Sequence, residues 1–262
     1  MRSDVRTVTT SKPPAVILAA GRGTRLGALT ADRPKPLLTV RGRPLLEWIL
    51  LGLRAAGIER ALCVVGYRGD QIRDYFGDGS RVDMRLSYVS QTAPHGTGAA
   101  LRLGRAFAEE GPVLMSFGDI LTDHDHYRSL LADFRADPCG AVMGINEMAD
   151  VSAGAAVVRA GRHVTGIVEK PDPALGLGNW NQAGVTAFGA PIWPFLEGLT
   201  ESSRGELEIT EAVAMLIGAG HEVRAVEFGG FWSDVGTPEA LREAERLWKS
   251  PLEDAPPPHV AL

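Results

Sequence analysis

A glycine-rich segment near the N-terminus has the residue types of a phosphate-binding loop. Residues 18–38 read LAAGRGTRLGALTADRPKPLL. Small residues such as Gly21 and Gly23 let backbone N–H groups approach a phosphate chain closely. Arg25 can neutralise a departing polyphosphate, and Lys35, held between two prolines, offers a second cation. The segment is neither a Walker A motif nor the dinucleotide fingerprint, and its glycines alone would also fit a flexible turn.

Two aspartates are candidates to hold a metal ion. Asp119 ends the tripeptide FGD, and Asp234 lies in the segment WSDVGTP. A carboxylate at the end of a strand can hold Mg²⁺ on a triphosphate. Asp123 and Asp125 form a further Asp-x-Asp pair, which suits either a glycosyltransferase metal motif or the acidic first turn of a helix. Histidines without ligand-like spacing receive no metal role: His95, His124, His126, His163 and His221.

A second glycine-rich turn, residues 91–98, reads QTAPHGTG. The side chain of Gln91 carries one acceptor and two donors, which is enough to read a pyrimidine edge. The other interpretation is a helix-capping turn in which Gln91 is solvated.

Two charged segments in the second half of the chain could bind a sugar phosphate, but their residue types are less specific than those of the glycine-rich segment. Glu169 can accept hydrogen bonds from sugar hydroxyls, and Lys170 can pair with a phosphate, although such a pair is usually surface charge. Residues 206–211 read ELEITE, and a capping box or a charged helix start explains most of this segment.

The first half of the chain alternates the hydrophobic patterns of strands and helices. Strands are predicted at residues 15–20, 62–65, 84–90 and 112–117, and helices at residues 45–53, 71–76 and 97–109. Such alternation predicts a parallel sheet with helices on both faces. Because ligands bind outside the carboxyl ends of such strands, the chemical segments that follow them should meet at one edge.

The second half is less regular, so the complete sheet should be mixed. Strands are predicted at residues 142–145, 155–158, 164–168, 182–188 and 223–228, and helices at residues 209–217 and 237–248. The last helix has Thr237 as its N-cap and Pro238 at its first position. We expect a single domain over residues 13–250, between a flexible N-terminus, residues 1–12, and a proline-rich tail, residues 251–262.

Composition restricts the class of protein. The 262 residues are 45% hydrophobic and 23% charged, which is ordinary for a globular chain and excludes long disorder. The net charge of −5 argues against nucleic acid as a partner. Two cysteines cannot make a disulfide framework. Without a visible targeting or membrane segment, we expect a cytoplasmic protein with no membrane partner.

The pattern LAAGxGTRLxxLTxxxPKPLL resembles the signature of sugar-1-phosphate nucleotidyltransferases, which join a nucleoside triphosphate to a sugar phosphate. The likeness continues to Trp248 and includes thymidylyl- and uridylyltransferases of glucose 1-phosphate and guanylyltransferases of heptose or mannose 1-phosphate. Residues that match the signature are Gly21, Gly23, Thr24, Arg25, Pro34, Lys35 and Pro36. The resemblance implies a Rossmann-like three-layer α/β/α sandwich with a mixed, mostly parallel central sheet.

The resemblance also implies roles for individual residues. Asp119 and Asp234 would bind Mg²⁺, Arg25 would stabilise the leaving pyrophosphate, and Lys35 and Lys170 would hold the reacting phosphates. Residues expected to bind the nucleotide are Leu18, Ala19, Ala20, Gly21, Gly23, Thr24, Gln91, Gly96 and Thr97. Residues expected to bind the sugar phosphate are Gly154, Glu169, Lys170 and Gln182. Gln182 stands where the family has Asn before Ala-Gly, and the Ser-Ala before Gly154 replaces a usual aromatic, which suggests an unusual acceptor.

Several alternatives remain open from the sequence. Gln91 favours UTP or dTTP as the nucleotide, with GTP and CTP as alternatives. The acceptor is a sugar 1-phosphate or a related heptose, polyol or cyclitol phosphate. Two other classes are a glycosyltransferase that uses Asp123 and Asp125 to consume an NDP-sugar, and a non-catalytic sensor of the same fold. The sequence leaves the oligomeric state undefined.

Overall fold

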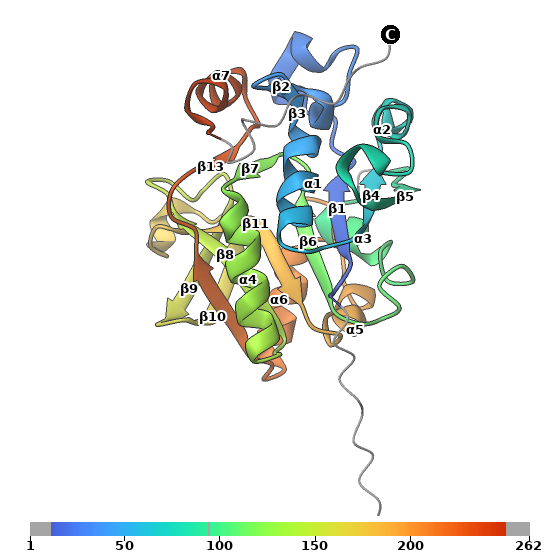
Figure 1. Ribbon diagram of the computed structural model, residues 1–262. Coiled ribbons are helices and arrows are strands. Elements are labelled where there is room, and N and C mark those ends of the chain that lie inside the picture. The colour runs from blue at the N-terminus through green and yellow to red at the C-terminus, as the bar shows by residue number, and fades with distance from the viewer. Residues whose placement is uncertain (1–11, 94, 250–262) are drawn as a thin grey trace, which may run out of the picture.

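A nine-stranded sheet forms the centre of the molecule (Figure 1). The computed structural model describes residues 12–93 and 95–249. The strands of this sheet are β1 (Ala15–Ala19), β4 (Arg60–Val65), β5 (Arg85–Ser90), β6 (Val113–Phe117), β8 (Ala141–Glu147), β9 (Ala155–Ala160), β10 (His163–Glu169), β11 (Trp180–Phe188) and β12 (Val223–Glu227). Their order is β5-β4-β1-β6-β11-β8-β12-β10-β9. Only β10 and β11 run against the other strands of this sheet, so the predicted mixed, mostly parallel sheet is confirmed.

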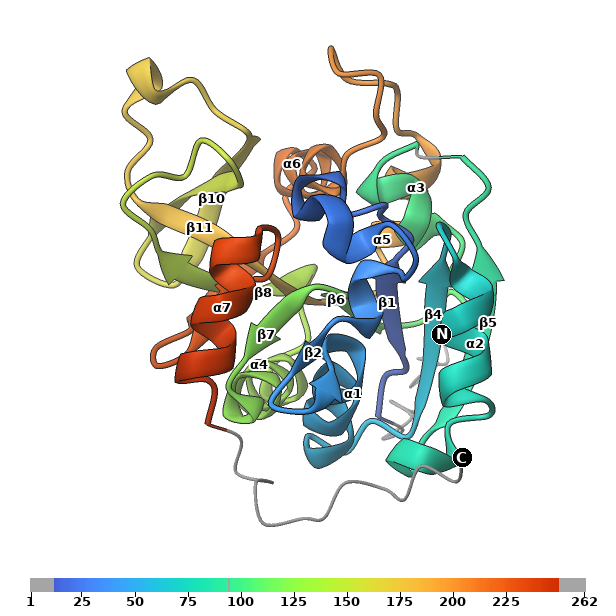
Figure 2. The ribbon, with the colours of Figure 1, turned by 90° about the horizontal axis from the view of Figure 1, so that it is seen from above.

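Helices cover both faces of the sheet. The α-helices are α1 (Leu45–Ala55), α2 (Gly69–Phe76), α3 (Thr97–Arg102), α4 (His124–Ala136), α5 (Ile192–Glu197), α6 (Ile209–Gly218) and α7 (Pro238–Leu247). Figure 2 shows α1, α2 and α4 on one side of the sheet and α3, α5 and α6 on the other. Two buried hydrophobic clusters fill the spaces between these layers. The predicted three-layer sandwich is therefore present.

Short elements lie outside the nine-stranded sheet, most of them at the carboxyl ends of the parallel strands. Two-residue strands β2 (Thr39–Val40) and β3 (Arg43–Pro44) pair with each other, as do β7 (Ile120–Thr122) and β13 (Trp232–Asp234). The 3₁₀ helices are η1 (Thr24–Thr30), η2 (Lys35–Leu37), η3 (Ser80–Val82) and η4 (Pro173–Leu175).

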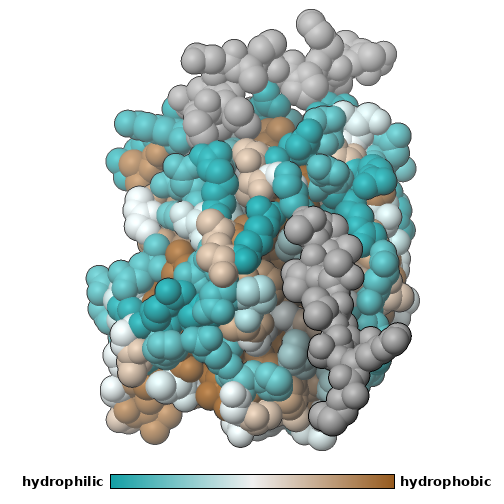
Figure 3. All heavy atoms as spheres, turned by 60° about the horizontal axis from the view of Figure 1, so that its bottom comes forward, coloured by the Kyte–Doolittle hydropathy of each residue, from teal (hydrophilic) through white to brown (hydrophobic). Residues whose placement is uncertain are grey.

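The face turned forward in Figure 3, which includes the bottom of Figure 1, is mainly hydrophilic.

Two local predictions differ from the structure. The helix predicted over residues 97–109 ends at Arg102, and the chain continues in tight turns. At Gly104 an added Cβ would lie 2.6 Å from a methyl of Val16, so only glycine fits where this turn packs on β1. Of the two explanations offered for residues 206–211, the capping box is wrong, because Glu208 makes no side-chain cap, whereas Glu211 in the first turn of α6 fits a charged helix start. The amide of Ile209 instead donates to Oγ1 of Thr97, 3.1 Å away.

The predicted N-terminal segment and tail fall almost wholly outside the described residues. Only Lys12 of residues 1–12, and none of residues 251–262, belongs to the described part. The division into a flexible segment, one domain and a tail stays a prediction. No helix within the two described ranges is long and apolar enough to cross a membrane.

A third buried cluster fixes the glycine-rich segment against the C-terminal helix. It joins Leu26 and Leu38 to Trp48 of α1 and to Trp248, which follows α7. The N-cap of α7 is as predicted, since Oγ1 of Thr237 accepts from the amide of Ala240. The third buried cluster consists of Leu26, Leu38, Val40, Leu45, Trp48, Leu121, Val235, Ala244 and Trp248. This cluster therefore connects the elements that carry Lys35 and Asp234.

His124 borders this cluster and makes stability depend on pH. The side chain is buried, its ring lies 5.8 Å from that of Trp248, and burial lowers the pKa of His124 from 6.5 to about 4. Unfolded chains take up this proton below about pH 6.5, whereas the folded chain resists protonation until about pH 4. Acidification from about pH 7 to 4 should therefore lower the free energy of unfolding by about 3 kcal/mol through this residue.

Denaturant titrations of the wild type and of His124→Phe at both pH values measure this contribution. The variant should lose about 3 kcal/mol less than the wild type on acidification, because phenylalanine does not titrate. An equal loss in both proteins would show that His124 is not the cause.

Candidate active site

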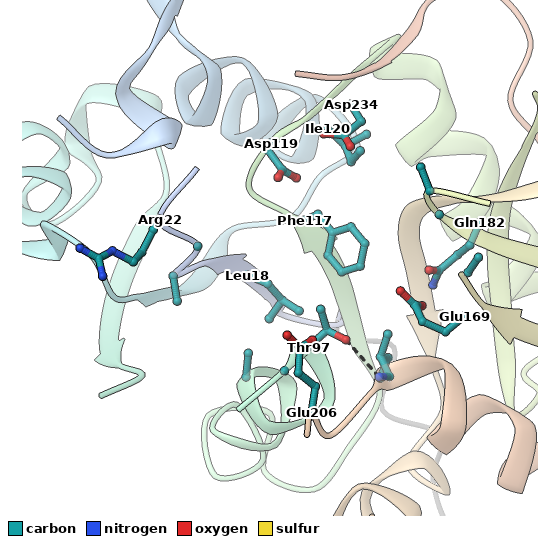
Figure 4. Close-up of a pocket in the computed structure, with 18 of the residues that line it drawn as sticks. Leu18, Arg22, Thr97, Phe117, Asp119, Ile120, Glu169, Gln182, Glu206 and Asp234 are labelled. Carbon is teal, nitrogen blue, oxygen red and sulfur yellow. Dashed lines mark hydrogen bonds between the residues drawn. The ribbon is translucent and has the colours of Figure 1, made fainter. Parts of the chain in front are cut away.

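A cavity of about 1120 Å³ opens at the carboxyl ends of β1, β4, β5 and β6 (Figure 4). Its lining includes residues that follow each of these strands and residues of β9, β10, β11 and β13. Predicted site residues that line it are Leu18, Ala20, Gly21, Gln91, Gly96, Thr97, Asp119, Gly154, Glu169, Gln182 and Asp234. The segments singled out from the sequence therefore meet at one edge of the sheet, where the α/β topology predicts a ligand.

The loop after β1 is shaped by Gly23. Its φ of +65° is left-handed, and an added Cβ would lie 3.1 Å from Cβ of Lys35. The carbonyl of Gly23 accepts from the amide of Leu26 at 2.9 Å and from Oγ1 of Thr30 at 3.0 Å. These bonds fold the segment back on itself. Ala19, Gly23 and Thr24 are part of this framework and do not line the cavity.

The ammonium group of Lys35 bridges two carboxylates. Nζ lies 2.6 Å from Oδ2 of Asp119 and 3.4 Å from Oδ1 of Asp234. The lysine side chain is only 7% exposed, whereas those of Asp119 and Asp234 are 33% and 41% exposed. Burial and then the charge of Asp119 raise the pKa of Asp234, while Lys35 and Arg25 oppose that shift. The carboxylates are thus close enough to need a cation between them.

The pairing of β7 with β13 brings the two aspartates together. Asp234 is the register partner of Ile120, the residue after Asp119, and the amide of Val235 donates to the carbonyl of Asp119 at 3.1 Å. Neither strand was predicted, because three residues are too few for a periodic pattern. The only sequence signal was that each aspartate belongs to a segment of the family pattern.

Arg25 lies on the outer side of this pair. Its guanidinium is 3.7 Å from Oδ2 of Asp234, and its side chain is 62% exposed. Gly236 makes room for it, since an added Cβ there would lie 2.7 Å from Nη2 of Arg25. Arg25 and Lys35 therefore flank the carboxylates as two cations, although neither lines the cavity itself.

The donor set suits a hard divalent cation that a ligand helps to hold. Mg²⁺ is usually bound by one or two carboxylates together with substrate phosphates and waters. Asp119 and Asp234 supply such oxygens around a point that already holds a positive charge. Among the described residues no group of three or more acidic, histidine or cysteine side chains is arranged to hold a metal alone. The two residues predicted for Mg²⁺ therefore fit it as partial ligands.

Gln91 braces the second glycine-rich turn as well as lining the cavity. Its Nε2 donates to the carbonyl of Gly96 at 3.1 Å, so one amide donor is already used. Gly96 has φ +97° and packs on Leu207, which leaves no room for a Cβ. The amide of Leu207 donates to His95, and that of Gly98 donates to Leu207, both at 2.8 Å. The segment before α6 therefore holds this turn in place.

The far end of the cavity is acidic and polar. Burial, followed by the charge of Glu208, raises the pKa of Glu169. Gln182 is 7% exposed, and its Nε2 has no hydrogen-bond partner within the described part of the chain. The register of β11 against β8 shifts between Gln182 and Thr186, and Gly184 within this bulge has φ +79°. Bulges re-aim side chains beside active sites.

Lys170 is the predicted site residue that the structure leaves outside the cavity. Its side chain is exposed and does not line the cavity. The backbone has a φ of +42°, which is strained for lysine, and its amide donates to the carbonyl of Gly154 at 2.7 Å. Lys170 therefore contributes a fixed backbone next to Glu169. Within residues 12–93 and 95–249, no acidic side chain lies close enough to its ammonium group to form an ion pair.

Several lining residues were not predicted as site residues. They include Arg22, Gly66, Tyr67, Met148, Glu206 and Trp232. Gly66 and Tyr67 follow β4, so the rule that ligands bind at strand ends could have found them. The indole N–H of Trp232 donates to the carbonyl of Ala183 at 2.9 Å, which ties β13 to the bulge of β11.

The Asp-x-Asp pair serves a structural purpose. Oδ2 of Asp123 accepts from the amide of Phe231 at 2.9 Å, and Asp125 forms an ion pair with Arg128 on α4. Neither aspartate lines the cavity. The interpretation as acids at a helix start is the one that the contacts support.

Comparison with known proteins agrees with this geometry. The profile of the family described as nucleotidyl transferase matches residues 14–250. A glucose-1-phosphate thymidylyltransferase of Streptomyces griseus is 36% identical over 242 residues, which cover 89% of this chain and 65% of the relative. The UTP–glucose-1-phosphate uridylyltransferase AglF of Haloferax volcanii is 32% identical over 234 residues, which cover 88% of this chain and 95% of the relative.

The fold also matches a solved structure. A UDP-glucose pyrophosphorylase in complex with UDP-glucose aligns with a TM-score of 0.83 and 24% identity, over 90% of this chain and 98% of that one. The Rossmann-like α/β fold expected from the sequence is therefore confirmed. The chain spans slightly less than two thirds of the length of the Streptomyces relative.

Replacing Lys35 tests whether the two carboxylates form a cation site. In Lys35→Met the carboxylates lose their ammonium counter-charge, so Mg²⁺ without nucleotide should bind about tenfold more tightly than to the wild type. Calorimetric titration with MgCl₂ measures this change, after denaturant unfolding has verified that the variant folds. Lys170→Met is the matched control, and it should bind Mg²⁺ as the wild type does. Weaker binding to Lys35→Met would contradict the cation site.

Proposed function

The chain belongs to the nucleotidyl transferase family, and from that premise we propose that it joins a nucleoside triphosphate to a sugar 1-phosphate. The products are an NDP-sugar and pyrophosphate, and related polyol or cyclitol phosphates are possible acceptors. The observation that carries the proposal is the convergence of Arg25 and Lys35, from the glycine-rich segment, on Asp119 and Asp234, which line the cavity. The names of the relatives support the same reaction class.

The reaction is a single in-line displacement. An oxygen of the acceptor phosphate forms a bond to the α-phosphorus, and the bond from that phosphorus to the bridging oxygen breaks. The electron pair of the broken bond leaves with pyrophosphate, on the side opposite the attacking oxygen. The acceptor phosphate is already an anion, so no protein base has to remove a proton. Positioning and neutralisation of charge are the remaining requirements.

Four charged side chains meet these requirements. Arg25 and Lys35 hold positive charge next to the phosphates, and Arg25 stabilises the pyrophosphate as it leaves. Asp119 and Asp234 would hold Mg²⁺, and enzymes of this family generally use a divalent metal. When bound, the metal neutralises phosphate charge at the α-phosphorus.

The acceptor lies at the acidic end of the cavity. Glu169 accepts hydrogen bonds from its hydroxyls, the free Nε2 of Gln182 donates to one of its oxygens, and the backbone at Gly154 contacts it. Lys170 reaches the acceptor phosphate only if its exposed side chain turns inward. UTP or dTTP is the proposed nucleotide, since Gln91 suits a pyrimidine. The cytoplasmic location stays a prediction.

A substrate panel tests the proposed function. ATP, CTP, GTP, UTP and dTTP are each mixed with several sugar and cyclitol phosphates and Mg²⁺, and pyrophosphate release is measured. Release that requires both substrates supports the proposal. Release of a nucleoside diphosphate from an NDP-sugar would indicate a glycosyltransferase, and binding without turnover would indicate a sensor.

Arg25 should matter for turnover and not for folding. A fixed cation at developing phosphate charge is worth several kcal/mol, so Arg25→Ala should lower kcat/KM about a hundredfold. Because the side chain is 62% exposed, the free energy of unfolding should change by less than about 1 kcal/mol. Arg33→Ala is the control, since Arg33 is an exposed arginine of the same segment that does not line the cavity. Near-normal turnover in Arg25→Ala would remove Arg25 from the mechanism.

Gln91 should help to choose the base. Loss of one well-placed polar contact costs roughly 1–3 kcal/mol, so Gln91→Ala should reduce the preference for UTP or dTTP over GTP by about ten- to a hundredfold. Competition among the five triphosphates at equal concentration measures the preference. A wild type that strongly prefers GTP or CTP would refute the base assignment but leave the reaction class intact.

A further inference from the structure

Arg22 is a cation in the wall of the cavity that the proposed reaction does not yet use. It stands between Gly21 and Gly23, and its side chain is exposed and lines the cavity. The guanidinium lies over the ring of Tyr67, 5.2 Å from the ring centre. No carboxylate of the described ranges forms an ion pair with Arg22. Its charge is therefore available to a bound anion.

Tyr67 is a fixed support for this guanidinium. Its hydroxyl donates to the carbonyl of Ala31 at 2.8 Å and accepts from Nε of Arg68 at 3.0 Å. Its backbone amide lies 3.4 Å from the carbonyl of Ala20, to which it donates. The ring is therefore held at both ends. Cation–π contact with a fixed ring reduces the number of positions that the Arg22 side chain can take.

The charges of the cavity are unevenly distributed. Of the lining residues in the described part of the chain, Arg22 is the one with a positive charge, and the acids that face the cavity are Asp119, Glu169, Glu206, Asp234 and Glu243. Lys35 and Arg25 are already in contact with Asp119 and Asp234. A triphosphate carries several negative charges, so the terminal phosphates need a further cation.

The direction of the reaction places those phosphates near Arg22. Figure 4 shows Asp119 between Arg22 on one side and Glu169 and Gln182 on the other. If the acceptor is bound by Glu169 and Gln182, the acceptor attacks from their side. In-line displacement then sends pyrophosphate away from them, toward Arg22.

We propose that Arg22 binds the β- and γ-phosphates of the nucleotide, and that Tyr67 is a positioning residue for its guanidinium. This inference rests on the proposed function. Arginine suits the task because its planar fork can donate two parallel hydrogen bonds to phosphate oxygens. A contact of Arg22 with the base is the competing interpretation, since Gln91 lines the same cavity.

Binding of three ligands to the full chain separates these interpretations. Inorganic pyrophosphate, UTP and UMP are titrated calorimetrically in the presence of Mg²⁺. In Arg22→Met the affinities for pyrophosphate and UTP should fall by about ten- to a hundredfold, while that for UMP should stay within about twofold. Arg22→Lys should recover part of the loss, because it keeps the charge without the fork. Arg33→Met should bind all three ligands as the wild type does.

A double-mutant cycle tests the role of Tyr67. Tyr67→Leu should weaken pyrophosphate binding when Arg22 is present. In the Arg22→Met background the same substitution should have little further effect, because Tyr67 acts through the guanidinium of Arg22. If Arg22→Met lost equal affinity for UMP and UTP, or bound pyrophosphate with unchanged affinity, the inference would be overturned. The proposed function fails separately, if the wild type releases no pyrophosphate in the substrate panel, and this inference would then fail with it.

Discussion

The ion-paired contact of Lys35 with Asp119 and Asp234 is the interaction on which the site depends. Two carboxylates facing one partly enclosed point repel each other, and the ammonium group offsets that repulsion at 2.6 and 3.4 Å. The three residues come from the glycine-rich segment, the end of β6 and the end of β13. Any change that moves one of these segments alters the charge balance at the point where phosphate transfer is proposed. The catalytic electrostatics and the packing of the molecule are therefore linked.

The rest of the fold can be understood as support for this contact. The third hydrophobic cluster packs Leu26 and Leu38 against Trp248, which fixes the lysine-bearing segment relative to α7. The pairing of β7 with β13 fixes the two aspartates relative to each other. The parallel order of β5, β4, β1 and β6 aligns the loops that follow these strands at one edge. The bulge at Gly184 interrupts the regular alternation of side chains along β11, so Gln182 is positioned independently of the residues that follow the bulge.

Much of this arrangement could be predicted from the sequence, because long apolar runs identify the strands and the strand-end rule places the loops. Asp119 and Gln91 were predicted at strand ends and line the cavity. The remainder depends on contacts between distant segments. Nothing in the residues around Asp234 indicates its partner Ile120, and nothing around Gly104 indicates its close approach to Val16. Lys170 matched a motif, yet its side chain is exposed. The motif therefore predicted where the backbone of Lys170 lies but not where its long side chain points.

The central claim is that Asp119, Asp234 and the nucleotide phosphates meet at one metal ion. Electron paramagnetic resonance of Mn²⁺, titrated into the chain with a non-hydrolysable triphosphate analogue, tests it directly, because the signal of the protein-bound complex differs from that of the free Mn²⁺–triphosphate complex. The account predicts a protein-bound signal in the wild type, its loss in Asp119→Asn/Asp234→Asn and its retention in Asp123→Asn/Asp125→Asn. A bound signal retained in full by the first variant, or lost in the second, would contradict the account.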